Sequence, residues 1–169
     1  LFQIFITQLV SLKADGVAKK MSKRAGTAVL LEDMVEEVGI DALRWFYLEK
    51  ALSTHMEFDV GLAKKQSAEN PVYYVQYAHA RICSIEENVA GKFSDGSGML
   101  DILSPSARML SSKIIQFPEV IEGIANDYNV HKLTTYAYEL AAAFSQFYRD
   151  VRVLQDDAPY NAGALKLAT

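Results

Sequence analysis

The chain has 169 residues, half of them hydrophobic, and a formal net charge of −4. This length and apolar fraction suffice for one soluble globular domain, or for one domain with part of another. The negative charge excludes a protein that coats nucleic acid non-specifically, because phosphate contacts need clustered cations. A single cysteine, Cys83, argues against a disulfide or a zinc site, and there is no apolar run of about 18 residues. We therefore expect a cytoplasmic protein without a membrane span.

The first residues predict strands. Leu1 to Ile6 is almost continuously apolar, which is typical of a strand buried on both faces. Such a strand needs neighbours that this chain does not supply, so we expect the chain to be part of something larger. From Gln8 to Leu12 the pattern alternates, and Ala14-Asp15-Gly16 carries a turn signal before residues 17–19. A strand and a turn should therefore lead into the next segment.

A cluster of cations follows this turn. The window from Lys13 to Arg24 holds five cations and one acid, so a polyanion is its natural partner. Two lysines three apart, with a hydroxyl between them and Gly26 soon after, suit a mobile loop that closes over a polyphosphate. The alternative is a solvated basic turn. The candidate phosphate-binding residues are Lys20, Met21, Ser22 and Lys23.

Two short helices are expected after the loop. Apolar residues recur at helical spacing from Leu31 to Val38, with acids in the first turn and Gly39 as the stop. Asp41 should cap a second helix that extends to Leu48. The string from Asp41 to Arg44 reads Asp-Ala-Leu-Arg, which by itself is compatible with an ordinary capped helix.

The strongest helix signal lies between residues 59 and 89. Asn70 precedes Pro71, as expected for a helix cap and a first helical position. A seven-residue apolar repeat follows and predicts a stripe that faces a helical partner. The stripe consists of Val75, Ala78, Ile82, Ile85 and Val89.

Aromatic and polar residues are expected to point away from this stripe. Such a face can stack on unpaired bases and hold phosphate, the usual way in which single-stranded RNA loops are recognised. The alternative is that the tyrosines are half-buried at a domain junction, with their hydroxyl groups hydrogen-bonded. The face comprises Tyr73, Tyr74, Tyr77 and Arg81, with Gln76 and His79 between them, and the candidate RNA-binding residues are Tyr74, Gln76, Tyr77 and Arg81.

The remainder of the chain predicts a helical bundle. A loop covers residues 92–98, and Ser104-Pro105 then opens a helix. Pro118 should start a shorter one. From Leu133 to Leu154 apolar residues alternate at spacings of four and three, the pattern of a bundle core. A last helix from Asn161 ends without a cap, so we expect the domain to be truncated there.

Four segments, in order and spacing, are similar to the C-terminal part of bacterial arginyl-tRNA synthetases. The Lys-Met-Ser-Lys string resembles the KMSKS signature of class I aminoacyl-tRNA synthetases, although Arg24 stands where many members have serine. The Asp-Ala-Leu-Arg string resembles the DALR anticodon-binding domain, which cysteinyl enzymes share. The run from Tyr73 to Arg81 is specific to arginyl enzymes. The matching segments are Gln8–Leu12, Lys20–Gly26, Asp41–Leu48 and Glu69–Ile82.

The resemblance implies a mainly α fold with two parts. Residues 1–58 would be a strand-turn remnant of the class I catalytic domain, with the KMSK loop and connecting helices. Residues 59–169 would be an all-α anticodon-binding helical bundle, truncated at its C-terminus.

The resemblance also implies a function, namely ATP-dependent attachment of arginine to tRNA-Arg through an arginyl-adenylate. Lys23 would contact the pyrophosphate in the transition state, with Lys20 and Ser22 shaping the loop. The parent enzyme would be a monomer that uses ATP with Mg²⁺. The fragment lacks the ATP site with its HIGH motif and the arginine pocket, so alone it should be inactive and hold no cofactor. The alternatives are a stand-alone tRNA-binding helical module without catalysis, and a helical interaction domain without an RNA role.

Overall fold

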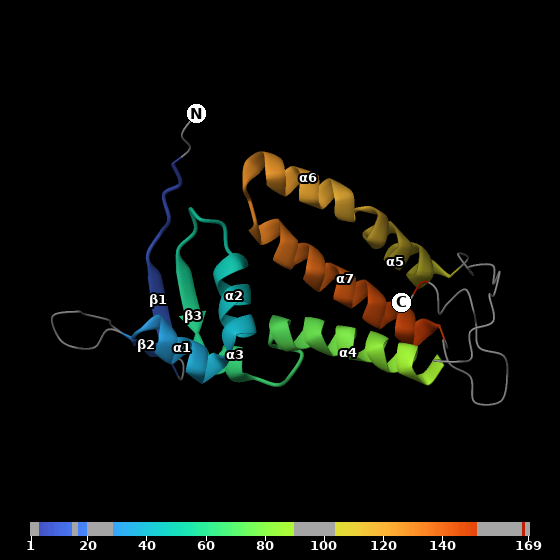
Figure 1. The fold of residues 1–169 in the computed structure, drawn as a ribbon, viewed down its shortest axis with the longest axis horizontal. Coiled ribbons are helices and arrows are strands. Elements are labelled where there is room, and N and C mark those ends of the chain that lie inside the picture. The colour runs from blue at the N-terminus through green and yellow to red at the C-terminus, as the bar shows by residue number, and fades with distance from the viewer. Residues whose placement is uncertain (1–3, 15–16, 20–28, 90–103, 152–166, 168–169) are drawn as a thin grey trace. The chain divides into compact units, whose positions relative to one another are not determined.

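The computed structural model describes most of the chain, which forms two compact units (Figure 1). The first unit comprises residues 1–73 and 123–135, and the second comprises residues 74–122 and 136–169. The described elements are mainly helical, as predicted, with a small sheet in the first unit. None of the described helices is both long and apolar enough to cross a membrane. The described residues are 4–14, 17–19, 29–89, 104–151 and 167.

The sheet of the first unit has the strand order β2-β1-β3. Strands β1 and β2 pair antiparallel with Ala14 opposite Val17. This pairing agrees with the predicted strand and turn, although Asp15 and Gly16 themselves lie outside the described residues. Strand β3 pairs parallel with β1 and was not predicted. The elements of this unit are β1 (Val10–Ala14), β2 (Val17–Lys19), α1 (Leu31–Val38), α2 (Ile40–Leu48), β3 (Met56–Asp59) and α3 (Val60–Lys64).

The strand predicted for residues 1–6 is not found in its described part. Ile4, Phe5 and Ile6 belong to no strand and are exposed. An apolar run becomes a strand only where a neighbouring backbone satisfies its N–H and C=O groups. Among the described residues no strand pairs with residues 4–6. Because this strand was expected to pair with neighbours outside the chain, its burial on both faces stays a prediction.

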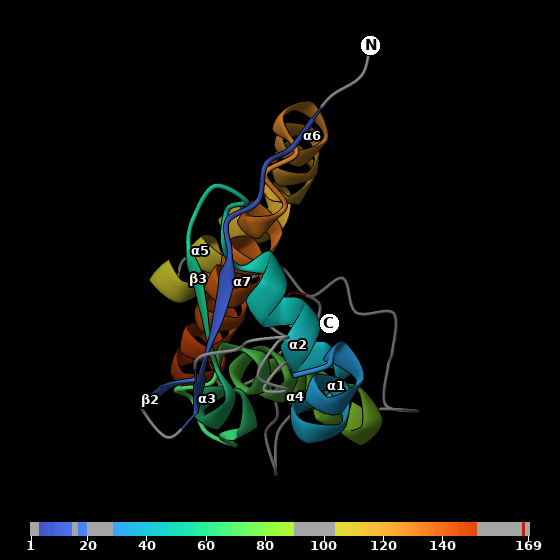
Figure 2. The same ribbon diagram turned by 90° about the vertical axis from the view of Figure 1, so that its left-hand side faces the viewer.

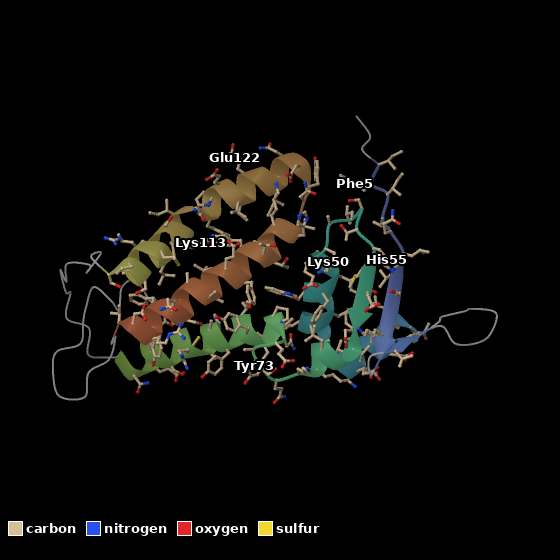
Figure 3. The ribbon with its side chains drawn as sticks, turned by 180° about the vertical axis from the view of Figure 1, so that it is seen from behind. Phe5, Lys50, His55, Tyr73, Lys113 and Glu122 are labelled. Carbon is tan, nitrogen blue, oxygen red and sulfur yellow. The ribbon has the colours of Figure 1, made fainter. Side chains whose placement is uncertain are left out.

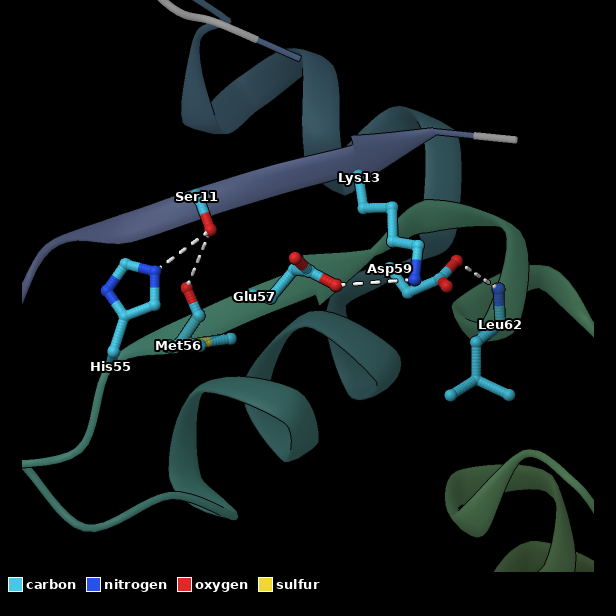
Figure 4. Close-up of polar contacts among 7 residues, drawn as sticks. All are labelled: Ser11, Lys13, His55, Met56, Glu57, Asp59 and Leu62. Carbon is cyan, nitrogen blue, oxygen red and sulfur yellow. Dashed lines mark hydrogen bonds and ion pairs between the residues drawn. The ribbon is translucent and has the colours of Figure 1, made fainter. Parts of the chain in front are cut away.

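Side chains connect the two parallel strands (Figure 4). The hydroxyl of Ser11 donates to the carbonyl of Met56 at 3.3 Å and lies 3.3 Å from Nε2 of His55. Farther along, Nζ of Lys13 lies 3.4 Å from Oε1 of Glu57. An exposed ion pair of this kind contributes only about 0–1 kcal/mol. The backbone ladder and the buried face therefore hold β3 in place.

Helices α1 and α2 complete the core of the first unit (Figure 2). Its centre is the fully buried Phe58, whose ring lies 5.5 Å from the ring of Phe46 in an edge-to-face arrangement. Both helices were predicted, but Asp41 does not cap α2. The cap position is Gly39, which also ends α1 and has a φ of +82°, and Asp41 instead lies in the first turn. Glycine tolerates this conformation because it has no Cβ.

Asn70 joins α3 to the start of α4 (Pro71–Val89). Its side-chain oxygen accepts a hydrogen bond from the N–H of Val72 at 3.0 Å, as expected for a helix cap. Its amide nitrogen donates to the carbonyl groups of Ala63 and Lys65, at 3.0 and 2.9 Å. Val72 belongs to the core of the first unit, so the chain just beyond residue 58 packs with the residues before it. The domain boundary between residues 58 and 59 stays a prediction.

The second unit is helical, and its core forms where α4, α5 and α7 meet. The apolar stripe of α4 is confirmed in its described part, because Ala78 and Ile85 are buried and Val75 and Ile82 pack against the same cluster. The side chain of Val89 lies outside the described residues. The other elements are α5 (Pro105–Ile115), α6 (Phe117–Asp127) and α7 (His131–Asp150). Parts of α4, α6 and α7 belong to the first unit.

Two polar contacts connect α5 with α7. The carbonyl of Lys113 accepts a hydrogen bond from the hydroxyl of Tyr136 at 2.9 Å, and burial raises the pKa of that phenol. The ammonium of Lys113, labelled in Figure 3, forms an ion pair with Glu139. The core pattern predicted from Leu133 onward holds at Phe144 but not at Leu133 itself, which is 41% exposed. The first turn of α7 belongs to the first unit, so it lies outside the bundle core.

The turn between α6 and α7 is held by polar contacts. Tyr128 has a φ of +58°, and its N–H donates to the carbonyl of Ile124 at 2.8 Å. Hydrogen bonds from Lys132 and Asn129 hold the pKa of the Asp127 carboxyl well below its ordinary value. These contacts are local in sequence, and the ring of Tyr128 also lies 5.4 Å from the ring of Phe5 in an edge-to-face arrangement.

Candidate nucleic-acid interface

The predicted phosphate loop lies outside the described residues. Strand β2 ends at Lys19, and the next described residue is Val29, two residues before α1. The roles of Lys20, Met21, Ser22 and Lys23 therefore stay predictions.

Two of the predicted RNA-binding residues contact each other on α4. Tyr77 is 50% exposed, and its hydroxyl oxygen lies 2.7 Å from Nη2 of Arg81, which donates to it. The two positions are four apart in sequence, so one helical turn brings their side chains together. Gln76 is exposed on the same helix.

Tyr74 differs from the prediction. It is only partly exposed and packs against the core of the second unit. Its ring lies 5.1 Å from the ring of Tyr138 on α7. Tyr74 precedes the buried Ala78 by four residues, so helical geometry turns its side chain toward the core rather than away from the stripe. The prediction of its orientation is wrong, and a contact of Tyr74 with RNA stays a prediction.

Arg81 has a second aromatic neighbour, which was not predicted from the sequence. The guanidinium carbon of Arg81 lies 4.8 Å from the ring centre of Tyr77 and 4.6 Å from the ring centre of Tyr148 on α7. Both distances fall within the range of cation–π attraction. The apolar pattern of α7 places Phe147 in the core and Tyr148 beside it, but no local signal shows that this tyrosine meets Arg81.

A pocket of about 250 Å³ opens beside this cluster, between α4 and α7. Among the described residues that line it, Arg81 is the one cation and none is a carboxylate. Along α4 the side-chain amide of Asn88 donates to the carbonyl of Ser84 at 2.7 Å, which fixes both residues at the wall. The main lining residues are Tyr77, Arg81, Ser84, Ile85, Asn88 and Tyr148.

A hollow of about 180 Å³ in the first unit has a different character. It lies between residues 7–10, the end of α2 and Met56, and its cation is Lys50. The ammonium of Lys50 lies 3.1 Å from a carboxylate oxygen of Glu49. This local ion pair offsets the positive charge, so the hollow favours a phosphate less than the Arg81 pocket does.

The chain is similar to known arginine–tRNA ligases. Among curated relatives, the arginine–tRNA ligase of Dehalococcoides mccartyi strain CBDB1 is 48% identical over 162 residues, which cover 95% of this chain and 29% of that protein. The arginine–tRNA ligase of Symbiobacterium thermophilum is 44% identical over 170 residues, covering 98% of this chain and 30% of that protein. The chain thus spans less than a third of the length of these relatives.

Solved structures show the same likeness. A structure from Campylobacter jejuni, assigned as an arginyl-tRNA synthetase, is 34% identical with a TM-score of 0.79 and covers 96% of this chain and 35% of that chain. The Thermus thermophilus arginyl-tRNA synthetase is 23% identical with a TM-score of 0.62, which supports the fold. It covers 86% of this chain and 25% of that chain.

A family model described as the DALR anticodon binding domain matches residues 75–169. The match begins within α4 and includes every residue that lines the Arg81 pocket. Because this match covers more than half of the chain, the chain belongs to the DALR anticodon-binding domain family.

Proposed function

We propose that the chain is the part of an arginine–tRNA ligase that carries the ATP-phosphate loop and the tRNA anticodon-binding bundle. The observation that carries this proposal is the extent of the similarity. Relatives named arginine–tRNA ligase match 90–98% of the chain at 41–48% identity, whereas the family model begins only at residue 75. A stand-alone tRNA-binding module would not need the residues before the bundle, so the ligase is favoured.

In the proposed reaction the carboxylate of arginine attacks the α-phosphorus of ATP, which releases pyrophosphate and forms arginyl-adenylate. A ribose hydroxyl of tRNA-Arg then takes the arginyl group and releases AMP. ATP with Mg²⁺ and arginine would bind mainly through parts of the ligase that this chain does not include. The parent enzyme would act as a monomer in the cytoplasm.

Lys20 and Lys23 would act on the phosphates during the first step. Negative charge grows on the departing pyrophosphate, and an ammonium is a compact point charge that can follow it. Ser22 and Met21 would shape the loop between the two lysines. The Lys23 contact forms mainly in the transition state, so it should affect the rate of adenylate formation more than the affinity for tRNA.

The test uses the full-length ligase with Lys23→Ala. We expect adenylate formation to slow by about a hundredfold or more, the usual cost of losing one preorganised charge contact in a transition state. The measurement is arginine-dependent ATP–pyrophosphate exchange with tRNA-Arg present.

Lys19→Ala is the matched control, because it removes the same charge at the end of β2, just before the loop. This variant should keep a nearly normal exchange rate and normal tRNA affinity. A nearly normal rate for Lys23→Ala would contradict the assignment of the loop.

The bundle would supply the tRNA contacts. Tyr77 and Arg81 are the proposed tRNA-binding pair, with the exposed Gln76 beside them, and Tyr74 would contribute from its half-buried position. The support for the pair is its geometry, since an accessible ring and a guanidinium lie within one helical turn.

A further inference from the structure

We propose that Tyr128, in the turn between α6 and α7, is a positioning residue of the ligase. Its ring would hold the segment of residues 4–9, which leads into β1 and on toward the predicted phosphate loop. This inference rests on the proposed ligase function and adds to it a residue that lies outside the predicted sites.

The backbone of Tyr128 has an unusual conformation. Tyr128 directly follows α6 with a φ of +58°, and among the described residues it is the one residue other than glycine with a positive φ. Its N–H donates to the carbonyl of Ile124 at 2.8 Å, the bond that a glycine commonly makes at the end of a helix. A bulky side chain disfavours this conformation, whereas asparagine tolerates it and stands one position later, at Asn129. A tyrosine at this position therefore points to a role for its ring.

The ring of Tyr128 contacts a part of the chain that is distant in sequence. The ring of Phe5 lies 5.4 Å away at an interplanar angle of 63°, which is the edge-to-face arrangement that aromatic pairs prefer. Both residues belong to the first unit, and Figure 3 labels Phe5. The two residues are 47% and 49% exposed, so their contact joins two surface segments and is not part of the core.

The turn holds the Tyr128 ring in a fixed direction. On the helix side, the carboxylate of Asp127 accepts a hydrogen bond from the N–H of Asn129 at 3.0 Å and pairs with the ammonium of Lys132. On the other side, the N–H of Val130 donates to the carbonyl of Tyr128 at 3.0 Å. These bonds fix the backbone before and after Tyr128, so the ring offers Phe5 a preformed contact.

The segment of residues 4–9 connects this contact to the sheet. It belongs to no strand, and Ile4 and Ile6 on either side of Phe5 are 85% and 79% exposed. Farther along, the N–H of Gln8 donates to the carbonyl of Leu52 at 3.1 Å, and β1 then pairs with β2, which ends just before the predicted loop. A shift of the segment would therefore displace the sheet that leads into the loop.

The experiment compares Tyr128→Gly with the wild type in the full-length ligase. Glycine removes the ring but accepts a positive φ, so the melting temperature should stay close to that of the wild type. The kcat of arginine-dependent ATP–pyrophosphate exchange, with tRNA-Arg present, should fall by about tenfold, because small displacements of catalytic groups slow a reaction strongly. The KM for ATP should not change, because the lysine contacts form mainly in the transition state. A purely structural role would lower the melting temperature and leave kcat unchanged.

Three further variants test whether the contact with Phe5 is the cause. Phe5→Leu keeps the apolar bulk without the ring and should lower kcat by a similar factor. The double variant Phe5→Leu with Tyr128→Gly should lose no more than either single variant, because both act through one contact. Tyr128→Phe keeps the ring and should restore the normal rate.

Val130→Ala is the matched control. It truncates another apolar side chain of the same turn, which is 38% exposed, and it should keep the normal kcat. Tyr128→Asn is a second variant that tolerates a positive φ without a tyrosine ring, so it replaces Tyr128→Gly if the glycine variant does not fold.

The outcomes separate this inference from the proposed function. If the folded Tyr128→Gly or Tyr128→Asn ligase exchanges at the normal rate, or if the losses of the double variant are additive, Tyr128 does not position the segment through Phe5. If the wild type shows no arginine-dependent exchange, the proposed function itself is wrong.

Discussion

At the scale of single residues, Asn70 shows how one side chain can organise a segment. Its amide makes three hydrogen bonds, one to the N–H of Val72 and two to carbonyl groups of the preceding residues Ala63 and Lys65. The side chain is 4% exposed, so water cannot easily replace these partners. Asn70 therefore caps α4 and fixes the direction in which the chain enters it.

Asn70→Ala should lower the free energy of unfolding of the first unit by about 2–3 kcal/mol. The loss combines a missing helix cap with carbonyl groups left without their donor. The measurement is urea unfolding followed by the fluorescence of Trp45, the one tryptophan of the chain, which packs against the core of this unit.

Asn70→Ser separates the two contributions, because serine can cap the helix but cannot reach both carbonyl groups. We expect it to recover about 1 kcal/mol of the loss. If both variants were as stable as the wild type, the hydrogen bonds of Asn70 would contribute nothing to stability.

At the scale of elements, two glycines differ in their backbone conformation. Gly39 stands between α1 and α2 with a φ of +82°, a backbone conformation that residues with a side chain rarely adopt. Gly123 lies inside α6, and a Cβ added at either glycine would meet nothing within 4 Å. The two sites thus differ in backbone conformation and not in available space.

Gly39→Ala should therefore destabilise the first unit by about 1–3 kcal/mol through backbone strain. Gly123→Ala should stabilise the same unit by about 0.5–1 kcal/mol, because alanine loses less conformational freedom in a helix than glycine does. Urea unfolding monitored by Trp45 fluorescence compares the two variants directly. Equal effects of both changes would mean that the conformation at Gly39 does not require glycine.

At the scale of the whole molecule, the proposed division of labour predicts that the 169-residue chain alone has no arginine-charging activity. Adenylate formation needs sites for ATP and arginine, and the chain spans only 29–30% of the length of the ligases described above. The same preparation should give the circular dichroism spectrum of a helical protein, because the residues from Asn70 onward are expected to fold as a bundle. Full-length ligase is the control in the charging assay, and charging above background by the chain alone would refute the prediction.

Features that depend on neighbouring residues in the sequence were determined by the sequence alone. The Asn-Pro start of α4, the Gly39 stop and the apolar repeat of α4 were all predicted and are found. Caps, stops and periodic faces arise from interactions within a few residues, so they leave a readable pattern. Four strings, at residues 8–12, 20–26, 41–48 and 69–82, likewise indicated the family, although the second lies outside the described residues.

Only the tertiary structure decided which distant residues meet. Strand β3 is four residues long and exists because β1 pairs with it. Residues 4–6 are as apolar as a buried strand, yet they have no described strand to pair with. Tyr74 faces α7, and Tyr148 reaches Arg81 across 67 positions of sequence, because the packing of α4 against α7 brings them together. Such pairings depend on the summed packing of both helices, which no local pattern records.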